Sequence, residues 1–153
     1  MYIISQKLQN AINNYMRDDD TLMLELIYES LSEVKISNDN DNSAFQDRVK
    51  FTLGDAILDL GKSKFWGVVE LFVPENMRRQ GISSKLLLAA DEYLTSEGYR
   101  SQVSNDASVK LHYGLGFRAF DNDEELSVDD TIKIREEWSS VMMLSPNFIK
   151  NSN

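Results

Sequence analysis

The run FWGVVELFVPENMRRQGISSKLLLAADEYLTS, residues 65–96, decides the fold. Its first part, Phe65–Val73, is almost wholly apolar, with Glu70 as its one charged residue. This pattern is typical of a central strand buried on both faces. Pro74 cannot donate a ladder hydrogen bond, so we expect the strand to end there. Apolar residues then recur one helical turn apart and predict an amphipathic helix over Ser83–Ser96.

The chain before this run predicts two helices, a polar loop and a β-hairpin. The hairpin turns at Gly54, because glycine adopts a positive φ at no steric cost. The expected helices are Gln6–Met16 and Leu22–Leu31, the expected loop is Ser37–Ser43, and the expected strands are Arg48–Leu53 and Ala56–Leu60.

The chain after this run predicts a strand over Arg100–Ser104 and a short helix to Leu115 that begins with Asn105 or Asp106 as its cap. Two closing strands, Phe117–Phe120 and Trp138–Leu144, follow, and an acidic connection separates them. Helices and strands thus alternate without an internal repeat, which indicates an α/β or α+β domain.

The composition excludes several classes of protein. The 153 residues include 16 Lys+Arg and 25 Asp+Glu, and the net charge is −9, which argues against a nucleic-acid-binding surface. The absence of Cys and a single His argue against a metal centre. No run approaches the roughly 20 apolar residues of a membrane-spanning helix. We therefore expect residues 1–153 to form one cytoplasmic domain.

The turn between the central strand and the helix is a candidate anion site. The N–H groups at a helix N-terminus are unpaired and lie at the positive end of the helix dipole, so Arg79–Ser84 could bind a phosphate or pyrophosphate. Gly81 would let such a ligand approach the backbone, although it is equally consistent with a simple turn. The P-loop and the three-glycine dinucleotide motif are both absent, which disfavours ATP and NAD chemistry.

At this turn the sequence resembles the GNAT superfamily of N-acetyltransferases. The family's acyl-CoA signature, R/Q-x-x-G-x-G/A, is matched by Arg78–Ser83, with Ser83 in place of the last small residue. A second family block, Asn-x-x-(Ala/Ser)-x-x-(Leu/Phe)-Tyr-x-x-x-Gly-Phe, is matched by Asn105, Ser108, Leu111, Gly116 and Phe117, with His112 in the Tyr position. A His in this position resembles amino-acid N-acetyltransferases such as phosphinothricin acetyltransferase.

This resemblance implies a mixed central sheet that is splayed at the fourth strand and flanked by helices, with acetyl-CoA as co-substrate in the splay. Pantetheine would then lie against Leu71, Phe72 and Val73 and the side chain of Asn105, with Ser108 close beside it. The pyrophosphate would lie on Arg78, Arg79, Gln80, Gly81, Ile82, Ser83 and Ser84.

The candidate catalytic side chains are His112, Tyr113 and Glu70. Asn105, Ser108 and His112 share one helix face, and the resemblance makes His112 the general acid for the departing thiolate, whereas a lone helix histidine is often idle. Tyr113 is the fallback donor, although it should point about 100° around the helix. Glu70 is the candidate base if burial raises its pKa, and otherwise a solvated carboxylate.

The predicted activity is acetyl transfer from acetyl-CoA to a primary amine by direct attack in a ternary complex, because the chain has no Cys nucleophile. The alternative is a non-catalytic acyl-CoA-binding or protein-interaction module on the same fold. The acidic connection, Asp121–Asp130, is either solvated or attracts a cationic amine. The sequence leaves open the acceptor, which could be a small molecule or a protein amine, and the oligomeric state, including a homodimer.

Overall fold

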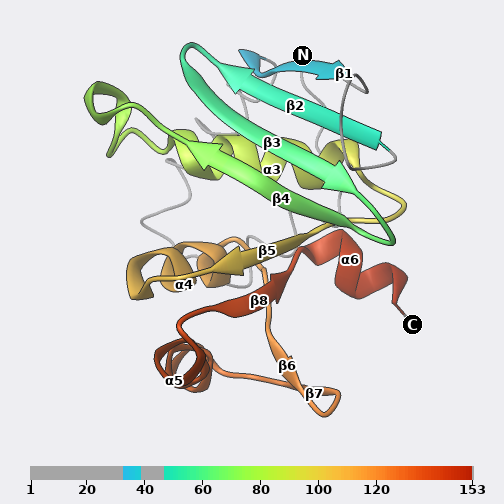
Figure 1. The fold of residues 1–153 in the computed structure, drawn as a ribbon, viewed down its shortest axis with the longest axis vertical. Helices are drawn as coiled ribbons and strands as arrows, with labels where there is room; N and C mark the ends of the chain where they lie inside the picture. Colours follow the sequence, from blue (N-terminus) through green and yellow to red (C-terminus); the bar gives the residue numbers. More distant parts are fainter. Residues whose placement is uncertain (1–32, 39–46, 153) are drawn as a thin grey trace, which may run out of the picture.

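A six-stranded sheet forms the centre of the computed structural model, which describes residues 33–38 and 47–152 (Figure 1). The strand order is β1-β2-β3-β4-β5-β8. The strands are β1 (Lys35–Asn38), β2 (Asp47–Leu53), β3 (Ala56–Lys62), β4 (Trp66–Phe72), β5 (Arg100–Val103) and β8 (Val141–Leu144). The predicted mixed sheet is confirmed, since β4 and β5 run parallel and the other neighbours run antiparallel.

The sheet opens between β4 and β5. Within the described residues these two strands pair only at Gly67 opposite Arg100, and Figure 1 shows them diverging toward their C-terminal ends. On the other edge of β4 the register moves from Leu60 opposite Val68 to Asp59 opposite Glu70, which makes Val69 a β-bulge. The predicted splay at the fourth strand is therefore present.

The expectation that the central strand is buried on both faces is wrong. Val69 is 44% exposed and Phe72 is 45% exposed, because β5 leaves β4 beyond Gly67. Val68, Leu71 and Val73 still pack against the core. The apolar residues of this strand therefore divide between the core and the edge of an opening.

The helices cover the sheet and fix the strand ends. They are α3 (Ile82–Tyr93), α4 (Asp106–Gly114), α5 (Val128–Trp138) and α6 (Pro146–Asn151), with a 3₁₀ turn, η3 (Glu75–Met77). α3 packs on β2 and β3, whereas α4 packs on α5, which in turn lies against β8. The predicted helix after the glycine turn is confirmed, although it ends at Tyr93 rather than Ser96.

The C-terminal third differs from the sequence prediction. Phe117–Phe120 is not a regular strand: Arg118 makes an isolated bridge to Leu144, and Phe120 begins the short hairpin of β6 (Phe120–Asp121) and β7 (Glu124–Glu125). Trp138 belongs to α5 rather than to the last strand. The acidic connection is therefore a hairpin and the first turn of a helix, where Asp129 and Asp130 complement the helix dipole.

Some predictions fall on residues that the structure does not describe. The helices expected at Gln6–Met16 and Leu22–Leu31 lie outside the described residues, as does most of the loop expected at Ser37–Ser43. Ser37 and Asn38, which were assigned to that loop, belong to β1. Among the described residues, no helix is long and apolar enough to cross a membrane.

The last helix, α6, is held against α3 by buried polar contacts. The backbone N–H of Asn147 donates to Asp91 Oδ1 at 3.1 Å, and the Asn147 side chain donates to the Asp91 carbonyl at 2.8 Å. Gly98 lies beneath the start of α6 with φ +65°, and a Cβ added there would be 2.0 Å from the backbone nitrogen of Phe148. Both its conformation and its contact therefore require glycine.

We predict that Gly98→Ala lowers the free energy of unfolding by about 2–5 kcal/mol, because the new methyl group would meet backbone that cannot move alone. The matched control is Gly114→Ala at the end of α4, where an added Cβ has nothing within 4 Å. Its expected effect is between neutral and a gain of about 1 kcal/mol. Denaturant unfolding of both variants measures the difference, and equal stabilities would contradict the prediction.

Candidate functional site

The turn from β4 to α3 presents unpaired backbone donors. Arg79 and Gly81 both have positive φ, of 65° and 72°, and Gly81 is the N-cap of α3. The first intrahelical bond of the cap runs from Lys85 N to Gly81 O at 3.1 Å, so the N–H groups of Ile82–Ser84 lie in the first turn, where a helix leaves its donors unpaired.

Two side chains of this turn brace it from within. Arg78 Nε donates to the Val73 carbonyl at 3.1 Å, and Gln80 Nε2 donates to the Asn76 carbonyl at 3.2 Å. The Arg78 bond joins the chain on the two sides of η3, whereas the Gln80 bond ties the turn back to η3 itself. The sequence analysis assigned both side chains to a pyrophosphate. The structure shows that each also makes a hydrogen bond within the turn, which the sequence did not indicate.

A pocket of about 440 Å³ opens at the turn. It contains nearly every residue predicted for the pyrophosphate and for the adjoining part of pantetheine, although Gln80 does not line it. Met77 and Leu111 also line it, and the sequence did not single them out as pocket residues. The predicted residues that line it are Leu71, Phe72, Val73, Arg78, Arg79, Gly81, Ile82, Ser83 and Ser84.

A second cleft, of about 520 Å³, lies where β4 and β5 diverge. Leu71 lines both cavities, so both border on β4. The second cleft contains Glu70, Asn105, Ser108 and His112, which the sequence predicted to share a site. The side chain of Asn105 caps α4, because its Oδ1 accepts from the Ser108 backbone N–H at 2.8 Å, so only its amide nitrogen could donate to a ligand.

His112 is buried and both of its ring nitrogens have partners. Nδ1 lies 2.7 Å from the Ser108 carbonyl oxygen, and Nε2 lies 2.9 Å from Ser101 Oγ. Phe117 packs edge-on against the ring at 5.0 Å between centroids. A carbonyl only accepts, so Nδ1 carries the proton and Nε2 of the neutral ring accepts from the serine hydroxyl. His112 is therefore a fixed cleft residue rather than an idle surface histidine.

Burial lowers the pKa of His112, and the hydrogen bond to the Ser108 carbonyl offsets part of this effect. The charged imidazolium loses hydration in the interior, whereas the neutral ring keeps both hydrogen bonds. The lowered pKa therefore favours the neutral ring over the imidazolium. The role of general acid, which the resemblance implied, stays a prediction.

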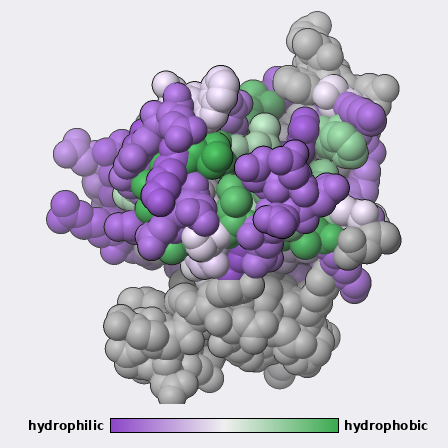
Figure 2. All heavy atoms as spheres, turned by 90° about the horizontal axis from the view of Figure 1, so that it is seen from below, coloured by the Kyte–Doolittle hydropathy of each residue, from purple (hydrophilic) through white to green (hydrophobic). Residues whose placement is uncertain are grey.

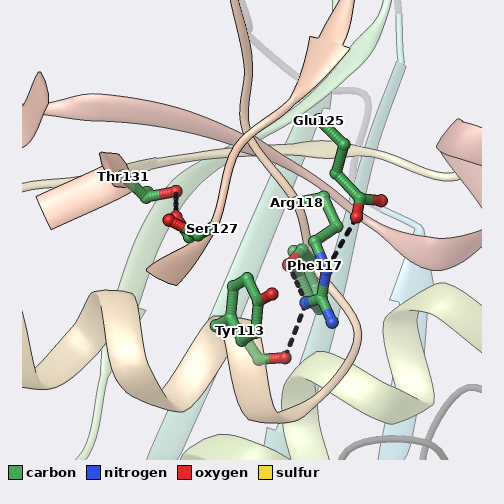
Figure 3. Close-up of polar contacts among 6 residues, drawn as sticks. All are labelled: Tyr113, Phe117, Arg118, Glu125, Ser127 and Thr131. Atoms are coloured by element: carbon green, nitrogen blue, oxygen red, sulfur yellow. Dashed lines mark hydrogen bonds and ion pairs between the residues drawn. The ribbon is translucent and has the colours of Figure 1, made fainter. Parts of the chain in front are cut away.

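Tyr113 lines neither cavity. The Arg118 guanidinium lies 3.5 Å from the centre of its ring, and Arg118 Nη1 donates to the carbonyls of Tyr113 and Phe117 at 2.8 and 2.7 Å (Figure 3). Arg118 Nε also lies 3.9 Å from Glu125 on β7. Tyr113 therefore helps to enclose a buried arginine at the end of α4, which does not favour its use as the fallback proton donor.

Glu70 lines the second cleft but is exposed to solvent. The burial on which its role as the base depended is therefore absent, because β5 separates from β4 here. The exposure of Glu70 agrees with the alternative interpretation, in which its carboxylate faces water. Glu70 remains placed beside the cleft that also contains His112.

The acidic residues of the β6–β7 hairpin are exposed, and Glu125 among them also lies 3.9 Å from Arg118 Nε. In Figure 1 this hairpin lies below β8, away from the open ends of β4 and β5. Figure 2 views the molecule from below, and hydrophilic side chains predominate among those described on this face. Among the described residues, no group of three or more His, Asp or Glu side chains is arranged to hold a metal ion.

Comparison with known proteins shows the family of the chain. The model of the Acetyltransferase (GNAT) family matches residues 37–117, just over half of the chain, and the chain therefore belongs to the GNAT acetyltransferase family. No curated protein matches it in sequence.

Two solved structures are similar to the chain. A candidate acetyltransferase from Agrobacterium tumefaciens is 19% identical, with 83% of this chain and 89% of that chain covered and a TM-score of 0.43. A Bacillus subtilis acetyltransferase in complex with CoA is 15% identical, with 85% and 92% covered and a TM-score of 0.44.

The lowered pKa predicts how His112 affects stability. Its ordinary pKa is about 6.5, so below that pH the unfolded chain binds a proton that the folded chain resists, and stability falls as pH falls, by at most about 1.4 kcal/mol per pH unit. We expect His112→Gln to remove part of the loss between about pH 6.5 and 5. Parallel denaturant titrations measure this difference, and identical pH slopes would contradict it.

Proposed function

We propose that the chain is an N-acetyltransferase that transfers the acetyl group of acetyl-CoA to a primary amine by direct attack in a ternary complex. The family uses acetyl-CoA. The observation that carries the proposal is the turn Arg78–Ser84, most of whose residues line a pocket that shares Leu71 with the cleft between β4 and β5. One elongated ligand with an anionic end and a thioester end suits this pair of cavities.

In this proposal the pyrophosphate binds the N-terminus of α3, where the N–H groups of Ile82–Ser84 and the helix dipole favour an anion. Pantetheine then runs beside Leu71, Phe72 and Val73, where β4 lies beyond its last pairing with β5. The amide nitrogen of Asn105 is the side-chain donor on the opposite wall. The thioester thus reaches the cleft that holds His112 and Glu70.

The chemistry needs a neutral amine, an acceptor for its proton and a donor for the departing thiolate. Of the residues that line the second cleft, Glu70 and His112 are those with titratable side chains. The exposed Glu70 would attract an ammonium group and pass its first proton to water. His112 would take the proton that the amine releases on attack and return it to the thiolate. The chain has no cysteine that could carry the acetyl group between substrates.

The charges of the chain bear on the class of the acceptor. A net charge of −9 and the exposed Glu70 favour a cationic amine, either a small molecule or a protein amine, over a nucleic acid. The resemblance of the His112 position to phosphinothricin acetyltransferase stays a prediction, as do a single domain over residues 1–153, a cytoplasmic location and a homodimer. The alternative function is a module that binds acyl-CoA without turnover.

Release of free thiol from acetyl-CoA in the presence of a panel of amines tests the proposal. We expect amine-dependent thiol release and a matching acetylated product detected by mass spectrometry. The same preparation should show an acetyl-CoA-dependent rise in Tm, since a ligand of the folded state stabilises it. A rise in Tm without turnover of any amine would instead support the non-catalytic module.

Gly81→Val tests the pyrophosphate site. We expect it to weaken acetyl-CoA binding roughly tenfold or more, because a branched side chain would lie where the ligand approaches the backbone. Valine is also strained at a φ of 72°, so Gly81→Asn is the matched variant. Asparagine tolerates positive φ but still adds a side chain.

Isothermal titration of both Gly81 variants, with a melting curve for each, separates blocked binding from lost folding. Weak binding by both folded variants supports the site. Wild-type affinity in folded Gly81→Asn would move the pyrophosphate elsewhere.

A further inference from the structure

Ser101 is one of the polar residues of the second cleft that the sequence did not single out. It lies on β5 and its side chain is 5% exposed. Its Oγ is 2.9 Å from His112 Nε2, and both residues line the cleft. In a sequence a serine within a strand carries no signal of this contact, because the partner comes from a helix eleven residues later.

The hydrogen bonds around the imidazole fix the direction of proton movement. Nδ1–H donates to the Ser108 carbonyl at 2.7 Å, so Nε2 holds the lone pair and the Ser101 hydroxyl donates to it. The backbone carbonyl orients the ring in the way that a carboxylate orients the histidine of a serine–histidine pair. A hydroxyl whose proton is directed at a fixed base is prepared to exchange that proton.

His112 has little direct access to the cleft. It is 2% exposed, Phe117 covers one edge of the ring, and the serine hydroxyl occupies Nε2. Because Nδ1 is hydrogen-bonded to the Ser108 carbonyl, Nε2 is the nitrogen that can exchange a proton. The Ser101 hydroxyl is hydrogen-bonded to Nε2. Proton transfer between this imidazole and a bound substrate therefore passes through the Ser101 hydroxyl.

We propose that Ser101 is a further catalytic residue, which relays protons between the reacting groups in the cleft and His112 Nε2. This inference rests on the proposed acetyl transfer.

The relay balances in two steps. As the amine nitrogen bonds to the acetyl carbon, it gives one proton to Ser101 Oγ while the hydroxyl proton moves to His112 Nε2, which makes the ring an imidazolium. When the carbon–sulfur bond breaks, the imidazolium returns its proton to Oγ and the hydroxyl proton moves to the thiolate. The products are an N-acetylated amine and free CoA, and both residues regain their starting state.

An isosteric pair of variants tests the relay. Ser101→Thr keeps the hydroxyl and Ser101→Val replaces it with a methyl group of the same shape, and both β-branched residues suit a strand. We expect Ser101→Val to lower kcat by roughly 10²-fold or more, with Ser101→Thr within about tenfold of wild type, because proton relay acts on the chemical step. Acetyl-CoA affinity, measured by titration calorimetry, should be the same in both variants.

The imidazole itself gives a readout that does not depend on turnover. His112 is the one histidine of the chain, so its ¹⁵N resonances need no assignment by mutation. We expect wild type to show a protonated Nδ1 and an unprotonated Nε2, and we expect the Nε2 resonance to shift in Ser101→Val but to stay near the wild-type position in Ser101→Thr. If neither β-branched variant folds, Ser101→Ala against wild type serves as the pair.

Several outcomes would overturn the relay. Equal kcat values for the Val and Thr variants, or a wild-type imidazole with its proton on Nε2, would do so while leaving the acetyl-transfer function intact. An acetyl group trapped on Ser101 would replace the relay with a serine nucleophile. Wild-type protein that binds acetyl-CoA but acetylates no amine would refute the proposed function and the relay together.

Discussion

Neighbouring strands of a sheet must stay about 4.8 Å apart to share hydrogen bonds, and β4 and β5 meet this condition only at Gly67 and Arg100 among the described residues. Beyond that pair, the antiparallel partners β3 and β8 hold the two strands in separate halves of the sheet. In this region the facing edges of β4 and β5 are not paired with each other among the described residues, although their other edges pair with β3 and β8. The separation leaves a cleft between the two strands. The candidate site residues lie on these strands, on the helix that follows each of them, or in the turn from β4 to α3.

The site depends on how each strand is continued. β4 leads through Pro74 and a 3₁₀ turn to the N-terminus of α3, and β5 leads directly to Asn105, which caps α4 with its side chain. Two helices therefore begin at the open end of the sheet, and both direct their N-termini toward that end. The first supplies backbone donors for an anion, whereas the second turns Ser108 and His112 into the gap. A single opening in the sheet thus joins an anion site to a proton-transfer site.

Local signals were sufficient for the parts of the fold that depend on local chemistry. Gly54 at a hairpin, Gly81 at a helix start and Asn105 as an N-cap each act on neighbouring backbone, so the sequence predicted them correctly. Helix α5 was missed because charged residues interrupt its apolar pattern, although Ser127 accepts from Asp130 as an N-cap signal. Ser145 followed by Pro146 was a similar unused signal for α6.

The candidate site was harder to predict where it depends on packing. The sequence placed Asn105, Ser108 and His112 on one face of a helix, but it could not show that the Ser101 hydroxyl would be hydrogen-bonded to Nε2 of His112. It also could not show that Glu70 is exposed, because an apolar run does not reveal where a neighbouring strand departs. The enclosure of Arg118 between Tyr113 and two carbonyls had no local signal either.

The bulge at Val69 changes the parity of β4. A strand alternates its two faces with a period of two, yet the residues of β4 that pack in the core are Trp66, Val68 and Leu71, with Val73 just beyond the strand. The interval across the bulge, from Val68 to Leu71, is therefore three. One extra residue thus keeps Leu71 and Val73 pointing inward while Glu70 and Phe72 point out. Deletion of Val69 would restore strict alternation. Glu70 would still lie opposite Asp59 and Leu71 opposite Leu58, so the side chains would keep their inner and outer positions, and the strand would lose only the local kink and added twist that a bulge provides.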